Sequence, residues 1–262
     1  MKLGKSKKYI IVLIILAVIV IAGVSIHNSS AHGHTRTTNT EQVSTKHIKH
    51  KQRTRVISPA EFNKISIKVS ATDIAVRSGN KYQVKIMDTK GANVSSQVKQ
   101  GTLIIRDHGP GRPFGDAGWA NQGLKLKVLI TIPTNQVLSA VIANCLDGDF
   151  SLKDVQLQTL KFKSDSGDFK LADTQLEKLN IKTDSGDSKL SNVVIKQDCK
   201  FKTDDGDFNL HHASKKDNYQ LITDEGEVKF FGNNCGSKFS KKNSSNNVLI
   251  KVETDDGDIL IN

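Results

Sequence analysis

Thr183-Asp184-Ser185-Gly186-Asp187 is one of five copies of a phrase that decides the fold of this chain. The other copies are Ser164-Asp165-Ser166-Gly167-Asp168, Thr203-Asp204-Asp205-Gly206-Asp207, Thr223-Asp224-Glu225-Gly226-Glu227 and Thr254-Asp255-Asp256-Gly257-Asp258, after a weaker first copy, Asp147-Gly148-Asp149. Successive glycines are 19, 19, 20, 20 and 31 residues apart. Such regular spacing is typical of a repeat whose copies stack on one another.

Apolar and polar residues alternate on both sides of each glycine. Leu179 and Ile181 precede Gly186, and Phe169 and Leu171 follow Gly167. This period of two indicates strands with one buried face. Each unit therefore reads as a strand, a tight corner and a second strand, and the corner favours glycine because a Cβ resists positive φ. The predicted corner glycines are Gly148, Gly167, Gly186, Gly206, Gly226 and Gly257.

The repeat predicts an all-β protein. Because no single unit can bury its apolar face alone, we expect residues 136–262 to form a parallel β-solenoid of about six 19-20-residue rungs, spaced by ~4.8 Å. Residues 56–135 alternate in the same way and are expected to form a capping β region in the same sheet system, with 68–79 resembling a degenerate rung. We expect the polar stretch 233–247 to bulge from a corner as a loop.

The N-terminus predicts a membrane anchor. Residues 9–26 form an uncharged apolar stretch, long enough for a transmembrane signal-anchor helix, and the lysines of the basic tail 1–8 precede it. The positive-inside rule keeps that tail in the cytoplasm and sends the rest of the chain outside as an ectodomain. A cleaved signal peptide is the alternative, although its apolar region would be shorter. Residues 27–55 have few large apolar side chains and are expected to form a disordered basic tether.

The net charge of +11 is concentrated before the repeat. Ten basic residues against Glu41 place nine of the eleven net charges before residue 56. The rest of the chain is nearly neutral, so the charge gives nucleic-acid binding little support. The same basic tether is attracted to anionic polymers and lipid headgroups.

Three cysteines cannot all pair within one chain. Cys145 and Cys199 occupy apolar positions of the repeat, in columns too far apart for a disulfide. Cys235 lies in the polar stretch and is expected to be a free thiol.

These features together resemble a known family. A membrane anchor, a strand ending in Leu129-Ile130-Thr131-Ile132-Pro133, and the Thr-Asp-Ser-Gly-Asp copies are similar to the bacterial "putative adhesin" domain family of surface proteins. The resemblance covers roughly residues 60 to 262. It implies a cell-surface β-solenoid, with adhesion as a name rather than a mechanism. The 31-residue step and the glycine-rich stretch 107–123 depart from the simple pattern.

Two acidic columns are the first candidate site. Stacking aligns the second residues of the phrase, which repel one another as carboxylates unless a hard cation such as calcium bridges them. The alternative is that aspartate beside glycine only shapes the corner; no other cofactor is expected. The calcium candidates are Asp165, Asp184, Asp204, Asp224 and Asp255. The fifth residues form the other column: Asp149, Asp168, Asp187, Asp207, Glu227 and Asp258.

Three functional classes follow. We expect a non-catalytic binding module at the cell envelope, whose partner is an envelope polymer or a surface protein. Phe114 and Trp119, in the glycine-rich stretch, could stack on sugar rings, and outward lysines mix with the acids: Lys161, Lys163, Lys170, Lys182, Lys189 and Lys202. One alternative is an ectodomain that senses envelope stress through a membrane partner. The other is a polysaccharide-active solenoid enzyme with paired carboxylates, but an active site should interrupt the repeat, and these acids belong to it.

Overall fold

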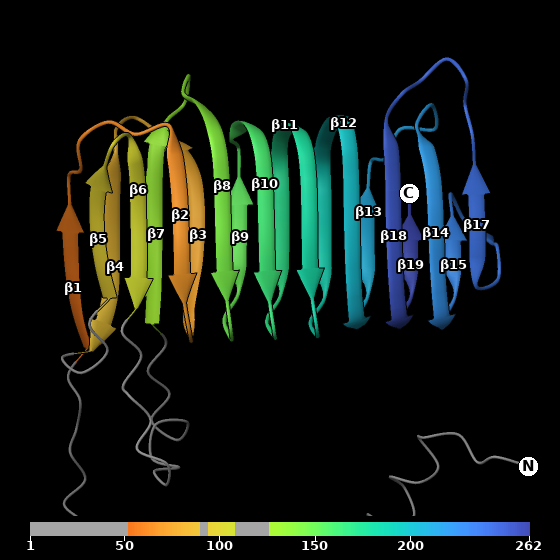
Figure 1. The fold of residues 1–262 in the computed structure, drawn as a ribbon, viewed down its shortest axis with the longest axis horizontal. Helices are drawn as coiled ribbons and strands as arrows, with labels where there is room; N and C mark the ends of the chain where they lie inside the picture. Colours follow the sequence, from red (N-terminus) through yellow and green to blue (C-terminus); the bar gives the residue numbers. More distant parts are fainter. Residues whose placement is uncertain (1–51, 90–93, 108–125) are drawn as a thin grey trace, which may run out of the picture. The chain divides into compact units, whose positions relative to one another are not determined.

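The structure, a computed structural model, describes residues 52–89, 94–107 and 126–262. These residues form strands and no helix, and the strands join in one 19-stranded sheet that curls on itself (Figure 1). The expected all-β class and the shared sheet system are confirmed. Within the described ranges, no helix is long and apolar enough to cross a membrane. The predicted tail 1–8, the anchor helix 9–26 and most of the tether lie outside the described residues.

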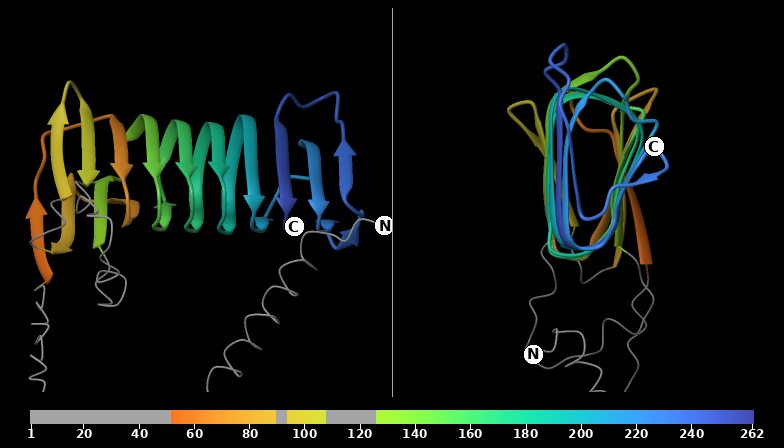
Figure 2. Two further views of the ribbon diagram at one scale, coloured as in Figure 1. Left: turned by 60° about the horizontal axis from the view of Figure 1, so that its bottom comes forward. Right: turned by 90° about the vertical axis from the view of Figure 1, so that its right-hand side faces the viewer.

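The central rungs have two flattened faces joined by two corners (Figure 2). The chain crosses one face as β10 (Gln156–Ser164), turns at Gly167, and returns across the other face as the first part of β11 (Phe169–Thr183). It turns again at Asp173, and the second part of β11 pairs in parallel with β10. β12 (Ser188–Asp205) repeats this path one rung further along.

The two faces differ in strand length. We call the face that contains β10 the long-strand face and the opposite one the short-strand face. In spatial order, the long-strand face consists of β5 (Val94–Lys99), β6 (Thr102–Asp107), β2 (Lys64–Val69), β8 (Val137–Cys145), β10, the second parts of β11 and β12, β18 (Leu249–Asp256), β14 (Asn218–Glu225) and β17 (Lys238–Lys241). The short-strand face consists of β1 (Gln52–Ile57), β4 (Gln83–Thr89), β7 (Leu126–Pro133), β3 (Thr72–Gly79), β9 (Phe150–Lys153), the first parts of β11 and β12, β13 (Phe208–His211), β19 (Ile259–Ile261), β15 (Val228–Phe230) and β16 (Asn233–Asn234).

The rungs do not stack in sequence order, which corrects the simple solenoid. The last rung, β18 and β19, lies between the rung of β12 and β13 and the rung of β14 and β15. Lys200 pairs with Lys251, and Lys251 in turn pairs with Gln220. The 31-residue step gives the chain enough length to run past β14, form β16 and β17, and return to the gap. The stretch expected to be only a loop therefore contributes two strands.

The sheet is mixed rather than wholly parallel. Within the expected capping region, β6 and β7 form a rung that stacks in parallel on the rung of β2 and β3, so part of the cap belongs to the solenoid. Antiparallel strands cover both ends: β5 pairs with β6 and β4 with β7, while β17 pairs with β14 and β16 with β15. Such strands end the parallel ladder, which would otherwise expose unpaired edges of longer strands.

The predicted tether ends earlier than expected. Residues 52–55 belong to β1, which pairs with β4, so the boundary lies before Gln52 instead of after residue 55. Arg53 and Arg55 on β1 bond the carboxylate of Asp88 on β4, with N–O distances of 2.6 and 2.7 Å. The Asp88 side chain is fully buried. The polar composition of this segment predicted disorder. Composition cannot reveal the carboxylate that pairs with these two arginines, because it lies more than thirty residues away in the sequence.

The core is one layer of side chains between the two faces. Phe150 stacks on Phe169 at 5.7 Å between ring centroids, and Phe162 from the opposite face lies 5.0 Å from Phe169. Ser188 occupies the next position in this column, fully buried, and its hydroxyl has no hydrogen-bond partner among the described residues. Cys199 is buried as expected, and burial raises the pKa of its thiol to about 12.

Four successive rungs have a second corner that the repeat phrase did not reveal. Asp154, Asp173, Asn192 and His212 all have positive φ, between 51° and 59°. Aspartate, asparagine and histidine are the non-glycine residues that adopt this conformation most readily. Asn192 Nδ2 donates to Asp173 Oδ1 at 2.9 Å, which links two of these corners. The signal was present in the sequence, but the residue type changes from rung to rung.

Candidate functional site

The predicted corner glycines lie in one column. A Cβ built on Gly186 would be 2.8 Å from the carbonyl carbon of Gly167, and one on Gly167 would be equally close to Gly148. Both glycines also have positive φ, +106° and +108°. The same contacts place Gly257 between Gly206 and Gly226, as the strand pairing does. Successive rungs approach too closely for a side chain at all six corners, and five of the six glycines also have positive φ, Gly226 being the exception.

Buried hydroxyls close the same corners from inside. The first residue of each phrase is buried, and its hydroxyl donates to the carbonyl two residues on in several rungs. The Ser164 hydroxyl donates to Ser166 at 2.6 Å, Thr203 to Asp205 at 3.0 Å and Thr254 to Asp256 at 3.1 Å. Serine or threonine at this position therefore fixes the turn that the glycine permits.

The fifth residues of the phrase form a hydrogen-bonded ladder. Asp149 Oδ1 accepts the backbone N–H of Asp168 at 3.0 Å, and the pattern continues along the stack to Asp258, which accepts the N–H of Glu227 at 2.9 Å. The ladder begins one rung earlier than expected, because Asp73 accepts the N–H of Asp149. One oxygen of each accepting carboxylate is thus committed to the next rung, which is a structural role for this column.

The second residues of the phrase, the calcium candidates, lie exposed at the same corner edge. Asp165, Asp184, Asp204, Asp255 and Asp224 follow one another along the stack. Among the residues that the structure describes, no group of three or more His, Cys, Asp or Glu side chains is arranged to hold a metal ion. Calcium binding at this column stays a prediction.

The outward lysines behave differently on the two faces. On the long-strand face, Lys163, Lys182 and Lys202 occupy successive strands in register and are exposed. None of them forms an ion pair within the described residues. On the short-strand face, by contrast, Lys170 pairs with Asp168 at 3.0 Å and Lys229 pairs with Glu227 at 3.5 Å.

The lysine column of the long-strand face has defined neighbours. Lys68 and Arg106 continue it beyond Asn144 toward the N-terminal end. At the other end it stops at Glu253, which bonds Lys251 at 2.6 Å. Each of the three exposed lysines is followed two residues later by an aspartate at the corner: Asp165, Asp184 and Asp204. The face therefore carries a basic column inside an acidic rim.

Phe114 and Trp119 lie outside the described residues. β6 ends before these two residues and β7 begins after them. Because β6 stacks on β2 and β7 on β3, both of these strand ends lie at the edge of the stack that carries the corner glycines. Asp107, at the end of β6, accepts the backbone N–H of Ser70 at 2.8 Å and the hydroxyl of Thr72 at 2.9 Å. This carboxylate holds the first corner, where Thr72 takes the place of a glycine.

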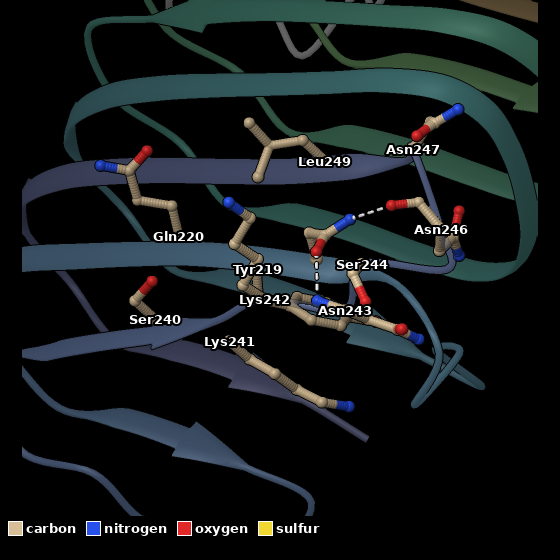
Figure 3. A pocket seen from close by; sticks show the side chains of 11 residues that line it. Tyr219, Gln220, Ser240, Lys241, Lys242, Asn243, Ser244, Asn246, Asn247 and Leu249 are labelled. Atoms are coloured by element: carbon tan, nitrogen blue, oxygen red, sulfur yellow. Dashed lines mark hydrogen bonds between the residues drawn. The ribbon is translucent and has the colours of Figure 1, made fainter.

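A pocket at the C-terminal end was not predicted. It has a volume of about 430 Å³ and lies between β14, β17 and the segment that returns from β17 to β18 (Figure 3). Its lining is rich in amides, hydroxyls and lysines: Asn218, Tyr219, Gln220, Ser240, Lys241, Lys242, Asn243, Ser244, Asn246, Asn247 and Leu249. The only sequence signal was the 31-residue step, which marks where the repeat is interrupted.

Comparison with known proteins identifies the family. The Toastrack DUF4097 family matches residues 62–262, which confirms the resemblance seen over the same stretch. A search of curated proteins finds no match. One similar crystal structure is of a "putative cell adhesion protein" from Clostridium sporogenes, with 14% identity, 81% of this chain and 99% of that chain covered, and a TM-score of 0.45. Another is of a "putative adhesin" from Bacteroides fragilis, with 16% identity, 81% and 97% coverage, and a TM-score of 0.35.

Proposed function

The chain belongs to the Toastrack DUF4097 family, and we propose that it is a non-catalytic binding module held outside the cell by the N-terminal apolar segment. Its partner in this proposal is an anionic polymer of the cell envelope. The long-strand face is the contact surface. The membrane anchor and the position outside the cell are parts of the proposal, supported by the sequence of residues 1–26.

One observation carries the choice of surface. Lys163, Lys182 and Lys202 form a row of unpaired ammonium groups on adjacent strands, which lie ~4.8 Å apart. Like charges at this spacing repel one another, and a polymer with repeated negative charges relieves that repulsion along the whole row. On the short-strand face, Lys170 and Lys229 already have carboxylate partners and offer less to such a polymer. The acidic rim repels the polymer from the glycine corner, so the polymer is expected on the side of the lysine row away from that corner.

The shape of the face suits the same partner. Its strands are hydrogen-bonded in register from β6 to β14, so the row runs along the stack instead of around it. A linear polymer can therefore contact several rungs at once, and many weak contacts on one rigid surface add up to useful affinity.

The test compares two triple variants of the full chain in a mild detergent, by cosedimentation with isolated bacterial envelopes. Changing Lys163, Lys182 and Lys202 to glutamine should lower retention at least fivefold, and polyphosphate should compete with retention of the unchanged chain. The matched control changes Lys170, Lys189 and Lys229 on the short-strand face, with the same loss of charge, and should retain most binding. Equal losses in both triples would assign binding to net charge, and no retention of the unchanged chain would refute the function.

A further inference from the structure

The pocket at the C-terminal end exists because the repeat is interrupted there. The chain leaves β17, passes the first residue of β14, and enters β18 on the other side of β14. The pocket is lined by the start of β14, by Ser240 and Lys241 of β17, by most of the return segment 242–247, and by Leu249 of β18. Within the Gly-Asp repeat, this is the place where the chain departs from the regular 19-20-residue path.

The walls are held by a hydrogen-bond network of asparagines. The Asn218 amide donates to the carbonyls of Asn246 at 2.7 Å and Val248 at 2.9 Å. Asn243 Nδ2 donates to the carbonyl of Lys216 at 2.8 Å, and Asn246 Nδ2 donates to Asp217 at 2.7 Å. These bonds fix the return segment against the strand and the preceding loop, so the pocket is formed before any ligand arrives.

A second set of polar groups in the pocket has no such task. The side chains of Gln220, Ser240, Lys242 and Asn247 line the pocket and make no hydrogen bond within the described part of the chain (Figure 3). They come from three different segments and supply amide donors and acceptors, a hydroxyl and an ammonium group. Such a set can bind several hydroxyl groups of one small molecule at once.

The charge of the pocket selects among polar ligands. Lys241 and Lys242 line it, and no lining residue is acidic. Lys215 and Lys216 belong to the adjoining loop, since their carbonyls accept bonds from Lys241 and Asn243. The nearest carboxylate in the network, Asp217, is bonded to Asn246 and does not line the pocket. Lys241 already bonds the Lys215 carbonyl, but Lys242 has no ion pair or hydrogen bond within the described residues, and a neutral ligand would leave its charge unmatched.

We propose that this pocket binds a single sugar unit that carries an anionic group, either phosphate or carboxylate. Its volume of about 430 Å³ lies within the ~300–1,000 Å³ usual for small-molecule sites. Gln220, Ser240 and Asn247 contact the hydroxyl groups of the sugar, and Lys242 contacts its anionic group. The site is separate from the lysine column of the long-strand face, so it stands or falls without the polymer contact proposed above.

Binding is measured by isothermal titration of the full chain in detergent with glucose 1-phosphate, glucuronate, glucose and inorganic phosphate. At least one of the two anionic sugars should bind, with glucose and inorganic phosphate at least tenfold weaker. Gln220→Ala and Lys242→Ala should each weaken that binding at least fivefold with an unchanged melting temperature, because neither side chain bonds the fold. Lys200→Ala, on the same face but outside the pocket, should bind as the unchanged chain does.

Three results would overturn the proposal. The first is that neither anionic sugar binds at millimolar concentration. The second is that inorganic phosphate binds as tightly as the sugar phosphate, which would leave the sugar without a role. The third is that Gln220→Ala and Lys242→Ala bind as Lys200→Ala does, which would place the ligand elsewhere.

Discussion

Gly186→Ala separates the two reasons for glycine at the corners of the stack. Gly186 has a φ of +106°, and a Cβ there would lie 2.8 Å from the carbonyl carbon of Gly167 and closer still to its oxygen. Backbone strain of this kind costs ~1–3 kcal/mol, and forcing atoms into a close-packed site costs a further ~1–3 kcal/mol. We therefore expect a loss of about 2 to 6 kcal/mol in the free energy of unfolding.

Gly232 offers a matched control for this change. Its φ is +83°, but a Cβ there would have no heavy atom within 4 Å. Gly232→Ala should therefore show the strain alone, ~1–3 kcal/mol, and Lys189→Ala, an exposed side chain, should stay within ~0.5 kcal/mol of the unchanged chain. Urea unfolding followed by circular dichroism measures all three. If Gly186→Ala loses no more stability than Gly232→Ala, the close approach of successive rungs is refuted.

Of three further predictions, the first two use the same urea assay and the third uses thermal melting. Burial by itself raises the pKa of Asp88, but hydrogen bonds from Arg53 and Arg55 outweigh burial and lower that pKa. The stabilisation from these bonds is present above the ordinary carboxyl pKa and is lost as pH falls through the lowered pKa. Asp88→Asn should therefore cost stability at pH 7 and progressively less in acid, and a stability loss that does not change with pH would contradict the ion pair. Ser188→Ala should be neutral or stabilise by up to ~1 kcal/mol because it removes a buried hydroxyl without a partner, whereas Ser164→Ala should cost ~1 kcal/mol by removing a bonded one; the opposite order would count against the packing described. EDTA should leave the melting temperature unchanged if the acidic columns only shape the corners, and a midpoint raised by added calcium would instead support the metal site.

The local features of the fold were predictable from sequence. Strand alternation and corner glycines repeat with a short period, and each depends on residues close in the chain, such as Phe169 and Gly167. The family resemblance followed from the same pattern. Stacking then had to align the glycines, which the structure confirms.

The order of the rungs could not be read from the same pattern. Lys200 could have paired with Gln220 or with Lys251, because the phrases that follow Gln220 and Lys251 are nearly identical and offer the same strand edge. Only the 31-residue step hinted at a different path. Contacts between residues far apart in the sequence could not be predicted either. Asp88 pairs with Arg53 and Arg55, which lie 35 and 33 residues before it, whereas composition predicted only a solvated tether at these arginines.

The candidate site was predictable only in part. The acidic and lysine columns follow from the repeat, and the sequence placed their members correctly. The pocket depends on the exchanged rung, because Gln220, Ser240 and Leu249 come together only when β17 and β18 flank β14 on opposite sides. Sequence spacing alone brings no two of these three residues together.

Cysteine cross-linking tests that exchanged order most directly. In a full chain whose native cysteines are changed to alanine, Lys200→Cys with Lys251→Cys places two thiols on adjacent strands, ~4.8 Å apart and within reach of a disulfide. Lys200→Cys with Gln220→Cys places them two strands apart, beyond that reach. Mild oxidation followed by mass spectrometry should find a disulfide in the first variant and none in the second. A disulfide in the second variant alone would mean that the rungs stack in sequence order, and the pocket described here would not exist.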